Sequence, residues 1–124
     1  MLKLAIFGNR NITDETLIVN SIADHVVFSH PTVVLHGGAS GPSAVAVEMA
    51  KNSEGLWTDV LFKPWSMVWS KLEFKPIFFY LRNKQIVENA DKVIVFDNGE
   101  KDSEVYRVIE LCKRKEKDFV VVEV

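Results

Sequence analysis

The residues best suited to chemistry lie in a glycine-rich stretch, Gly37–Ser43, with the sequence GGASGPS. Glycine lacks a Cβ, so such a loop lets the backbone adopt positive φ and approach a ligand closely. An apolar helical pattern begins at Pro42, and the first turn of a helix presents free N–H groups and the positive end of the helix dipole. These features together are typical of an anion site, usually one for phosphate. The other interpretation is a tight turn whose glycines allow a helix and a strand to pack closely.

The loop alone leaves both interpretations open, because it matches neither GxGxxG nor the Walker A pattern. The residues that it would contribute to a phosphate site are Gly37, Gly38, Ala39, Ser40, Gly41 and Ser43. Two arginines favour the phosphate interpretation, since guanidinium groups form bidentate contacts with phosphate. Arg10 follows Gly8 and Asn9. Arg82 precedes Asn83, whose amide can contact a base or ribose edge.

Short apolar runs alternate with helical patterns along the chain, which predicts an α/β fold. The expected strands are residues 2–7, 32–35, 58–62, 92–96 and 119–122, and the expected helices are residues 13–29, 42–52, 77–89 and 103–115. Parallel neighbours need crossover connections, so we expect a single Rossmann-like, doubly wound domain over residues 1–124 with a mainly parallel five-stranded sheet. Ligands bind at the carboxyl ends of strands in such sheets. The glycine loop, Arg10 and the turn at Gly99 are therefore predicted to share one rim.

The composition limits the possible partners. The 124 residues carry a formal net charge of −2, whereas a broad nucleic-acid surface needs clustered positive charge, so the composition counts against a nucleic-acid partner. The single Cys112 fits a packed core thiol and excludes a cysteine metal site, and no histidine or carboxylate cluster has metal-ligand spacing, so we expect no metal and no cofactor. No apolar run is long enough to span a bilayer, which favours a cytoplasmic protein. His36 is expected to bond to the backbone and not to act as a general base.

Five segments of the chain follow an order seen in a known superfamily. They read LAIFGNRNITD, VVLHGGASGPSAVAVEMA, FKPW, FYLRNKQIVENADKVIVFDNG and VVVEV. In this order they resemble the SLOG superfamily, which includes the DprA/Smf proteins and the Lonely Guy nucleotide phosphoribohydrolases, and most of all its small YspA/YpsA-like subgroup. The resemblance covers nearly the whole chain and implies a Rossmann-like fold that binds a nucleotide or nucleotide derivative at the rim. By position it implies ligand contacts for Gly8, Arg10, Gly37, Gly38, Ala39, Gly41, Trp65, Arg82, Asn83 and Gly99.

The chain departs from the family's pattern after the fourth expected strand. Asp102 and Ser103 stand where Gly-Thr is usual, and Tyr106 stands where the hydrolases have a glutamate. Glu104 is two positions early, so a helix would turn it about 200° away from that place. Cleavage of an N-glycosidic bond benefits from a carboxylate, so this departure weakens the case for an enzyme.

Three functions are compatible with these residues. The first is binding of a nucleotide or nucleotide-derived ligand by a sensor or a sequestering protein. The alternative is a nucleoside monophosphate phosphoribohydrolase, which needs a carboxylate from among Glu104, Asp102 and Glu48. The third is a DprA-like nucleic-acid or protein-interaction module. We also expect a homodimer or larger assembly, formed through an apolar middle segment that contains Trp57, Trp69, Phe74, Ile77, Phe78 and Phe79.

Overall fold

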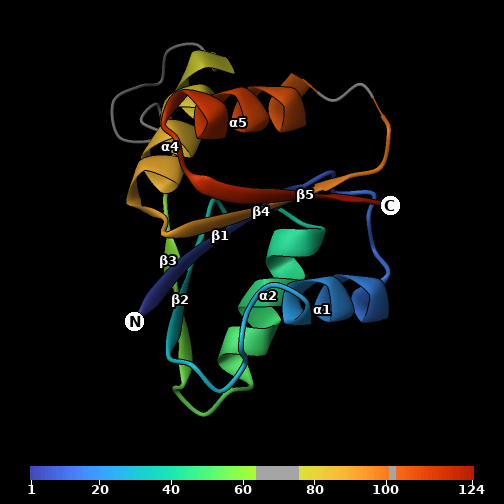
Figure 1. Ribbon diagram of the computed structural model, residues 1–124, viewed down its shortest axis with the longest axis vertical. Coiled ribbons are helices and arrows are strands. Elements are labelled where there is room, and N and C mark those ends of the chain that lie inside the picture. The colour runs from blue at the N-terminus through green and yellow to red at the C-terminus, as the bar shows by residue number, and fades with distance from the viewer. Residues whose placement is uncertain (64–75, 101–102) are drawn as a thin grey trace.

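The computed structural model describes residues 1–63, 76–100 and 103–124 (Figure 1). Its strands are β1 (Leu2–Gly8), β2 (Thr32–His36), β3 (Trp57–Leu61), β4 (Lys92–Asp97) and β5 (Asp118–Glu123). Its helices are α1 (Glu15–Ala23), α2 (Pro42–Lys51), α4 (Pro76–Asn89) and α5 (Ser103–Arg114). The five strands form one sheet in the order β3-β2-β1-β4-β5, and all four neighbouring pairs are parallel. The predicted α/β, Rossmann-like architecture is confirmed.

The helices cover both faces of the sheet, α1 and α2 on one side and α4 and α5 on the other (Figure 1). Successive residues of β1 therefore alternate between two cores. Leu4 and Ile6 pack in the core that includes α1 and α2 residues, whereas Ala5 and Phe7 pack in the core that includes α4 and α5 residues. This double burial explains why the central strands read as continuous apolar runs. Cys112 is fully buried in the second core, where burial raises the pKa of its thiol to about 11.

Helix α1 is shorter than the apolar periodicity of residues 13–29 predicts. It begins after Asp14, whose carboxylate accepts a hydrogen bond from the N–H of Leu17 at 3.1 Å and so caps the first turn. The helix ends at Ala23, although Val26 still packs in the core and is only 7% exposed. Val26 lies in the turn that leads back toward β2. Its burial therefore matches the spacing of the buried helix residues, although the helix has already ended. No helix of the described ranges is both long and apolar enough to cross a membrane.

Trp57 belongs to the core and not to an exposed face. It is 3% exposed, its indole Nε1 donates to the carbonyl of Phe28 at 3.1 Å, and the two rings meet edge to face at 5.7 Å. It is therefore not available to the self-association surface that the sequence predicts. The members of that segment whose side chains fall outside the described part of the chain are Trp69, Phe74, Ile77 and Phe78.

The strand order places a topological switch point at the centre of the sheet. The chain leaves β1 toward α1 and β2 on one side, whereas β4 leads to α5 on the opposite face (Figure 1). The loops after β1 and β4 therefore diverge, and Gly8 at the end of β1 lies beside Phe96 of β4. Ligands of open α/β sheets bind in the crevice that such divergence creates.

Candidate functional site

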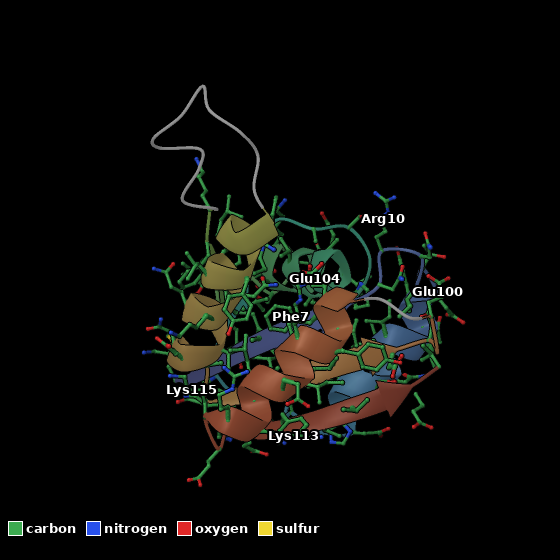
Figure 2. All side chains as sticks on the ribbon, turned by 90° about the horizontal axis from the view of Figure 1, so that it is seen from above. Phe7, Arg10, Glu100, Glu104, Lys113 and Lys115 are labelled. Carbon is green, nitrogen blue, oxygen red and sulfur yellow. The ribbon has the colours of Figure 1, made fainter. Side chains whose placement is uncertain are left out.

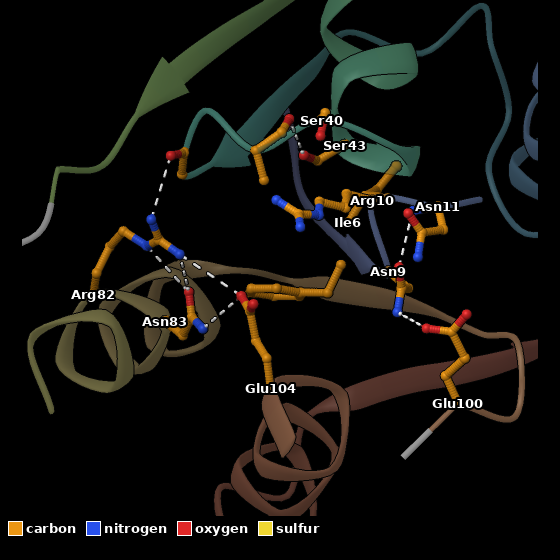
Figure 3. Close-up of a pocket in the computed structure, with 14 residues that line it drawn as sticks. Ile6, Asn9, Arg10, Asn11, Ser40, Ser43, Arg82, Asn83, Glu100 and Glu104 are labelled. Carbon is orange, nitrogen blue, oxygen red and sulfur yellow. Dashed lines mark hydrogen bonds and ion pairs between the residues drawn. The ribbon is translucent and has the colours of Figure 1, made fainter. Parts of the chain in front are cut away.

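A pocket of about 560 Å³ opens at this switch point (Figure 3). Four segments form its walls: residues 6–11 at the end of β1, the glycine loop with the first turn of α2, two residues of α4, and two residues around the start of α5. The polar or charged side chains of the lining are Asn9, Arg10, Asn11, Ser40, Ser43, Arg82, Asn83, Glu100 and Glu104. Residues far apart in the sequence thus meet at the rim where the strand pattern places them.

Glycines bring the loops after β1 and β2 into contact. Gly41 precedes α2 with φ of +85°, and a Cβ on it would lie 2.9 Å from both the Cα of Arg10 and the carbonyl oxygen of Asn9. A Cβ on Gly8 would lie 2.7 Å from Cγ of Pro42. The interpretation of close helix–strand packing therefore holds at both positions. The same contacts set Arg10 beside the N-terminus of α2.

Gly41→Ala should lower the free energy of unfolding by about 1–3 kcal/mol, because it adds backbone strain at positive φ and a clash with backbone atoms. Gly55→Ala is the matched control, since Gly55 has φ of +89° and no atom lies within 4 Å of the place that a Cβ would take. The control should show only the smaller cost of the backbone conformation. Urea unfolding of both variants measures the difference, and equal losses would show that the contact between the two loops is not tight.

The two arginines of the pocket have different surroundings. The Arg82 side chain is buried: Nε and Nη2 donate to Oδ1 of Asn83 at 3.2 and 3.0 Å, and Nη1 donates to the Gly37 carbonyl at 3.3 Å. Its guanidinium also lies 5.1 Å from the centre of the Phe79 ring and 3.7 Å from Oε1 of Glu104. Burial lowers the pKa of Arg82 below its usual value, and the Glu104 carboxylate partly offsets this. Arg82 therefore links α4 to the glycine loop and to the start of α5 at the back of the pocket.

Arg10, in contrast, is exposed and extends into the pocket next to the N-terminal turn of α2 (Figure 3). Within the described ranges, no hydrogen bond or ion pair holds its guanidinium. Gly41 offers no side chain to cap α2, so the N-cap residue leaves the first-turn N–H groups to other acceptors. A guanidinium and a helix N-terminus side by side form an anion-binding corner.

Two carboxylate–amide pairs form the opposite wall. Asn9 Nδ2 donates to Oε2 of Glu100 at 2.8 Å, and Asn83 Nδ2 donates to Oε1 of Glu104 at 3.2 Å (Figure 3). Carboxylate oxygens are hydrogen-bond acceptors, so this wall suits hydroxyl and amino groups of a ligand. The pocket therefore has a cationic corner that suits an anion and an acidic wall that suits hydrogen-bond donors.

The position of Glu104 corrects an expectation from the sequence. Glu104 lines the pocket, whereas Tyr106 is 47% exposed and is not among the lining residues. The helical angle between the two positions holds, but in α5, which begins at Ser103, the face that carries Glu104 lies toward the rim, and the face that carries Tyr106 does not. A carboxylate is thus present in the pocket. Figure 2 shows Glu104 at the same side of the molecule as Arg10 and Glu100, away from Lys113 and Lys115 at the other end of α5.

The remaining predicted site residues lie in different places. Gly38, Gly41 and Gly99 have positive φ and are not among the residues that line the pocket, although the first two belong to the loop that forms its wall. Glu48 lies on the exposed side of α2, 3.9 Å from Lys51. Two predicted residues lie outside the described part of the chain: Trp65 and Asp102. Across the described ranges, no group of three or more histidine, cysteine or acidic side chains could hold a metal ion.

The sequence analysis did not identify Glu100 as a candidate site residue. Its N–H donates to Oδ1 of Asn98 at 3.1 Å, and the turn brings its carboxylate to Asn9. The sequence feature that could have identified it is its position just after the fourth expected strand, at the rim. The amide of Asn9 reaches this carboxylate at 2.8 Å.

No family model matches the chain, and no curated protein matches it in sequence. A solved structure does match in fold: DNA processing protein A from Helicobacter pylori, described for its single-stranded DNA binding mode. The match has a TM-score of 0.70 at 19% sequence identity and covers 97% of this chain. The chain spans 64% of that protein's chain, which is less than two thirds of its length. At this identity the match shows the fold.

The match corrects the expectation that nucleic acid is not a partner. A protein with this fold binds single-stranded DNA, so neither the fold nor the formal net charge of −2 excludes nucleic acid. The expectation was based on the net charge of the whole chain, whereas a single strand needs cationic groups only where it contacts the protein. DNA processing protein A is a member of the SLOG superfamily, the group that the sequence motifs resemble. The chain is therefore similar in fold, over 97% of its length, to a protein of that superfamily.

Proposed function

We propose that the rim pocket binds a phosphate-bearing nucleotide unit. The observation that carries this proposal is the exposed Arg10 guanidinium beside the N-terminus of α2, in a pocket of about 560 Å³. The phosphate would lie at this corner, and the carboxylates of Glu100 and Glu104 would accept hydrogen bonds from ribose hydroxyls or base amino groups. With two arginines facing two glutamates, the lining carries no large excess of positive charge. This balance favours one phosphate in the pocket over a polyphosphate chain.

The nucleotide unit belongs, in our proposal, to a single strand of DNA. The fold match supports this source, because DNA processing protein A is described for binding single-stranded DNA. Bases of a single strand are unstacked and can enter a pocket one at a time, while the phosphodiester chain runs along the rim.

A free nucleoside monophosphate is the second candidate, and the position of Glu104 favours it. A carboxylate in the pocket supplies the group that N-glycosidic cleavage needs to stabilise a ribosyl cation or to activate water. In the structure Glu104 accepts a hydrogen bond from Asn83 and lies 3.7 Å from Arg82. Both contacts hold its carboxylate at the pocket wall, where a ribose could reach it.

A binding and product assay distinguishes these sources. Fluorescein-labelled oligothymidylate is titrated with the protein and followed by anisotropy, and unlabelled thymidine and adenosine monophosphates are added as competitors. We expect the oligonucleotide to bind and to lose affinity as salt is raised, because phosphate contacts release counterions. Competition by monophosphates with release of free base, detected by mass spectrometry, would instead support the second candidate. If neither class of ligand binds, the proposed function is wrong.

A further inference from the structure

The peptide group between Gly37 and Gly38 is held from both sides. Its carbonyl, on Gly37, accepts from Nη1 of Arg82 at 3.3 Å, and its N–H, on Gly38, donates to Nδ1 of His36 at 3.0 Å. One polar group of α4 and one of β2 thus fix the orientation of a single peptide plane. Because Gly37 lines the pocket, this plane is part of the pocket wall.

The contact with Gly38 determines the protonation of the His36 ring. A backbone N–H only donates, so Nδ1 must accept and cannot carry a proton. The ring proton then lies on Nε2, which donates to Oδ2 of Asp59 at 2.8 Å. His36 is 7% exposed at the end of β2, and Asp59 reaches it from β3. Asp59, His36 and Gly38 therefore form a directed chain of two hydrogen bonds that ends in the glycine loop.

Protonation of His36 would break one bond of this chain and keep the other. A second proton would turn Nδ1 into a donor that faces the Gly38 N–H, whereas Nε2 would still donate to Asp59, now as an ion pair. Histidine is the side chain whose charge ordinarily changes between about pH 5 and 8. The change would release the N–H of Gly38 and leave the ring in place, so that Arg82 alone would hold the peptide through the Gly37 carbonyl.

Few charged groups of the described chain surround this histidine. Asp59 faces it from β3, and Arg82 reaches the adjacent peptide from α4. The neighbouring end of β1, residues 6–8, is uncharged, as the register of Ala5 beside Leu35 places it next to His36. The charged residues of α2 pair with each other on its exposed side: Glu48 and Lys51.

We propose that His36 and Asp59 are positioning residues that hold the Gly37–Gly38 peptide in its binding orientation only while His36 is neutral. The part of this inference that concerns ligand affinity rests on the proposed function. The part that concerns the loop does not. On acidification the loop loses one of the two bonds that fix this peptide plane, and affinity for a phosphodiester ligand falls by about fivefold, the effect of one lost hydrogen bond.

Nuclear magnetic resonance of the unaltered protein tests the loop directly. At neutral pH the ring ¹⁵N spectrum should show a bare Nδ1 and a protonated Nε2 for His36. The Gly38 amide resonance should then shift with the same midpoint as the ring when pH is lowered. A proton on Nδ1 at neutral pH, or a Gly38 amide that does not respond while the ring titrates, would overturn the proposal.

Two substitutions separate positioning from a general structural role. In His36→Asn the side-chain oxygen can replace Nδ1 as acceptor for Gly38, so this variant should bind oligothymidylate with affinity independent of pH between about 5.5 and 8. In His36→Gln the amide can reach Asp59 but leaves Gly38 without its acceptor, so binding should be about fivefold weaker throughout that range. His30→Asn is the control, because His30 is exposed just before the opposite end of β2 and should leave the pH profile unchanged.

The phosphodiester probe does not itself titrate in this pH range, so a change in affinity reports on the protein. Equal affinities for the asparagine and glutamine variants would contradict the positioning role. A Gly38 amide that titrates with His36 in a protein that binds no oligothymidylate would support the loop mechanism and overturn only the proposed function.

Discussion

Arg82→Met should lower the free energy of unfolding by about 3–5 kcal/mol, the largest stability loss we expect from one substitution in this pocket. Methionine fills part of the same volume but donates no hydrogen bonds. The Gly37 carbonyl and the side-chain oxygen of Asn83 would lose three donated bonds. Glu104 would lose its ion-pair partner at 3.7 Å. Chemical denaturation followed by circular dichroism measures this loss.

Arg107→Met is the matched control for this experiment. Arg107 is an exposed residue of α5, so its replacement should change the free energy of unfolding by no more than about 0.5 kcal/mol. If the Arg82 and Arg107 variants were equally stable, Arg82 would not organise the pocket, and its guanidinium would be free to act as a ligand contact.

Arg10→Gln should weaken binding of oligothymidylate by about 10- to 100-fold, because charge-assisted hydrogen bonds to a phosphate are each worth roughly 1.5–3 kcal/mol. Glutamine keeps much of the length of the side chain and removes its charge. Stability should not change, since the Arg10 side chain is exposed and no hydrogen bond or ion pair holds it within the described ranges. Anisotropy titration at fixed salt gives the affinity, and thermal unfolding gives the stability.

Arg114→Gln is the matched control, because it tests whether the position of the positive charge matters. Arg114→Gln removes the same charge from the far end of α5, in its last turn, and should reduce affinity by less than about twofold. Equal losses for the two variants would indicate attraction by the net charge of the protein and not by a phosphate site at Arg10.

The order of elements and the shared rim could be predicted from the sequence. Apolar runs in residues 4–7 and 93–96 are continuous because β1 and β4 are buried on both faces, and this pattern differs from that of an amphipathic helix. Parallel pairing then brings every strand's carboxyl end to one side of the sheet. This is why Arg10 and the glycine loop could be placed together from the sequence alone.

The different surroundings of the two arginines could not be predicted, because they depend on packing. Both are arginines next to an asparagine in the sequence, yet one is 6% exposed and bonded to Gly37 while the other projects into the pocket. The direction of the Glu104 side chain could not be predicted either. It depends on where α5 begins and how its axis meets the rim, and sequence spacing gives only the angle between residues of one helix.

A crystal structure of the protein with a short oligothymidylate shows directly whether the rim pocket binds a nucleotide. We expect one nucleotide in the pocket, with its phosphate within hydrogen-bond distance of the Arg10 guanidinium and the first-turn N–H groups of α2. Its sugar or base should contact Glu100 or Glu104. An oligonucleotide that instead lies along the basic end of α5, near Lys113 and Lys115, with the rim pocket empty, would show that the pocket is not the binding site.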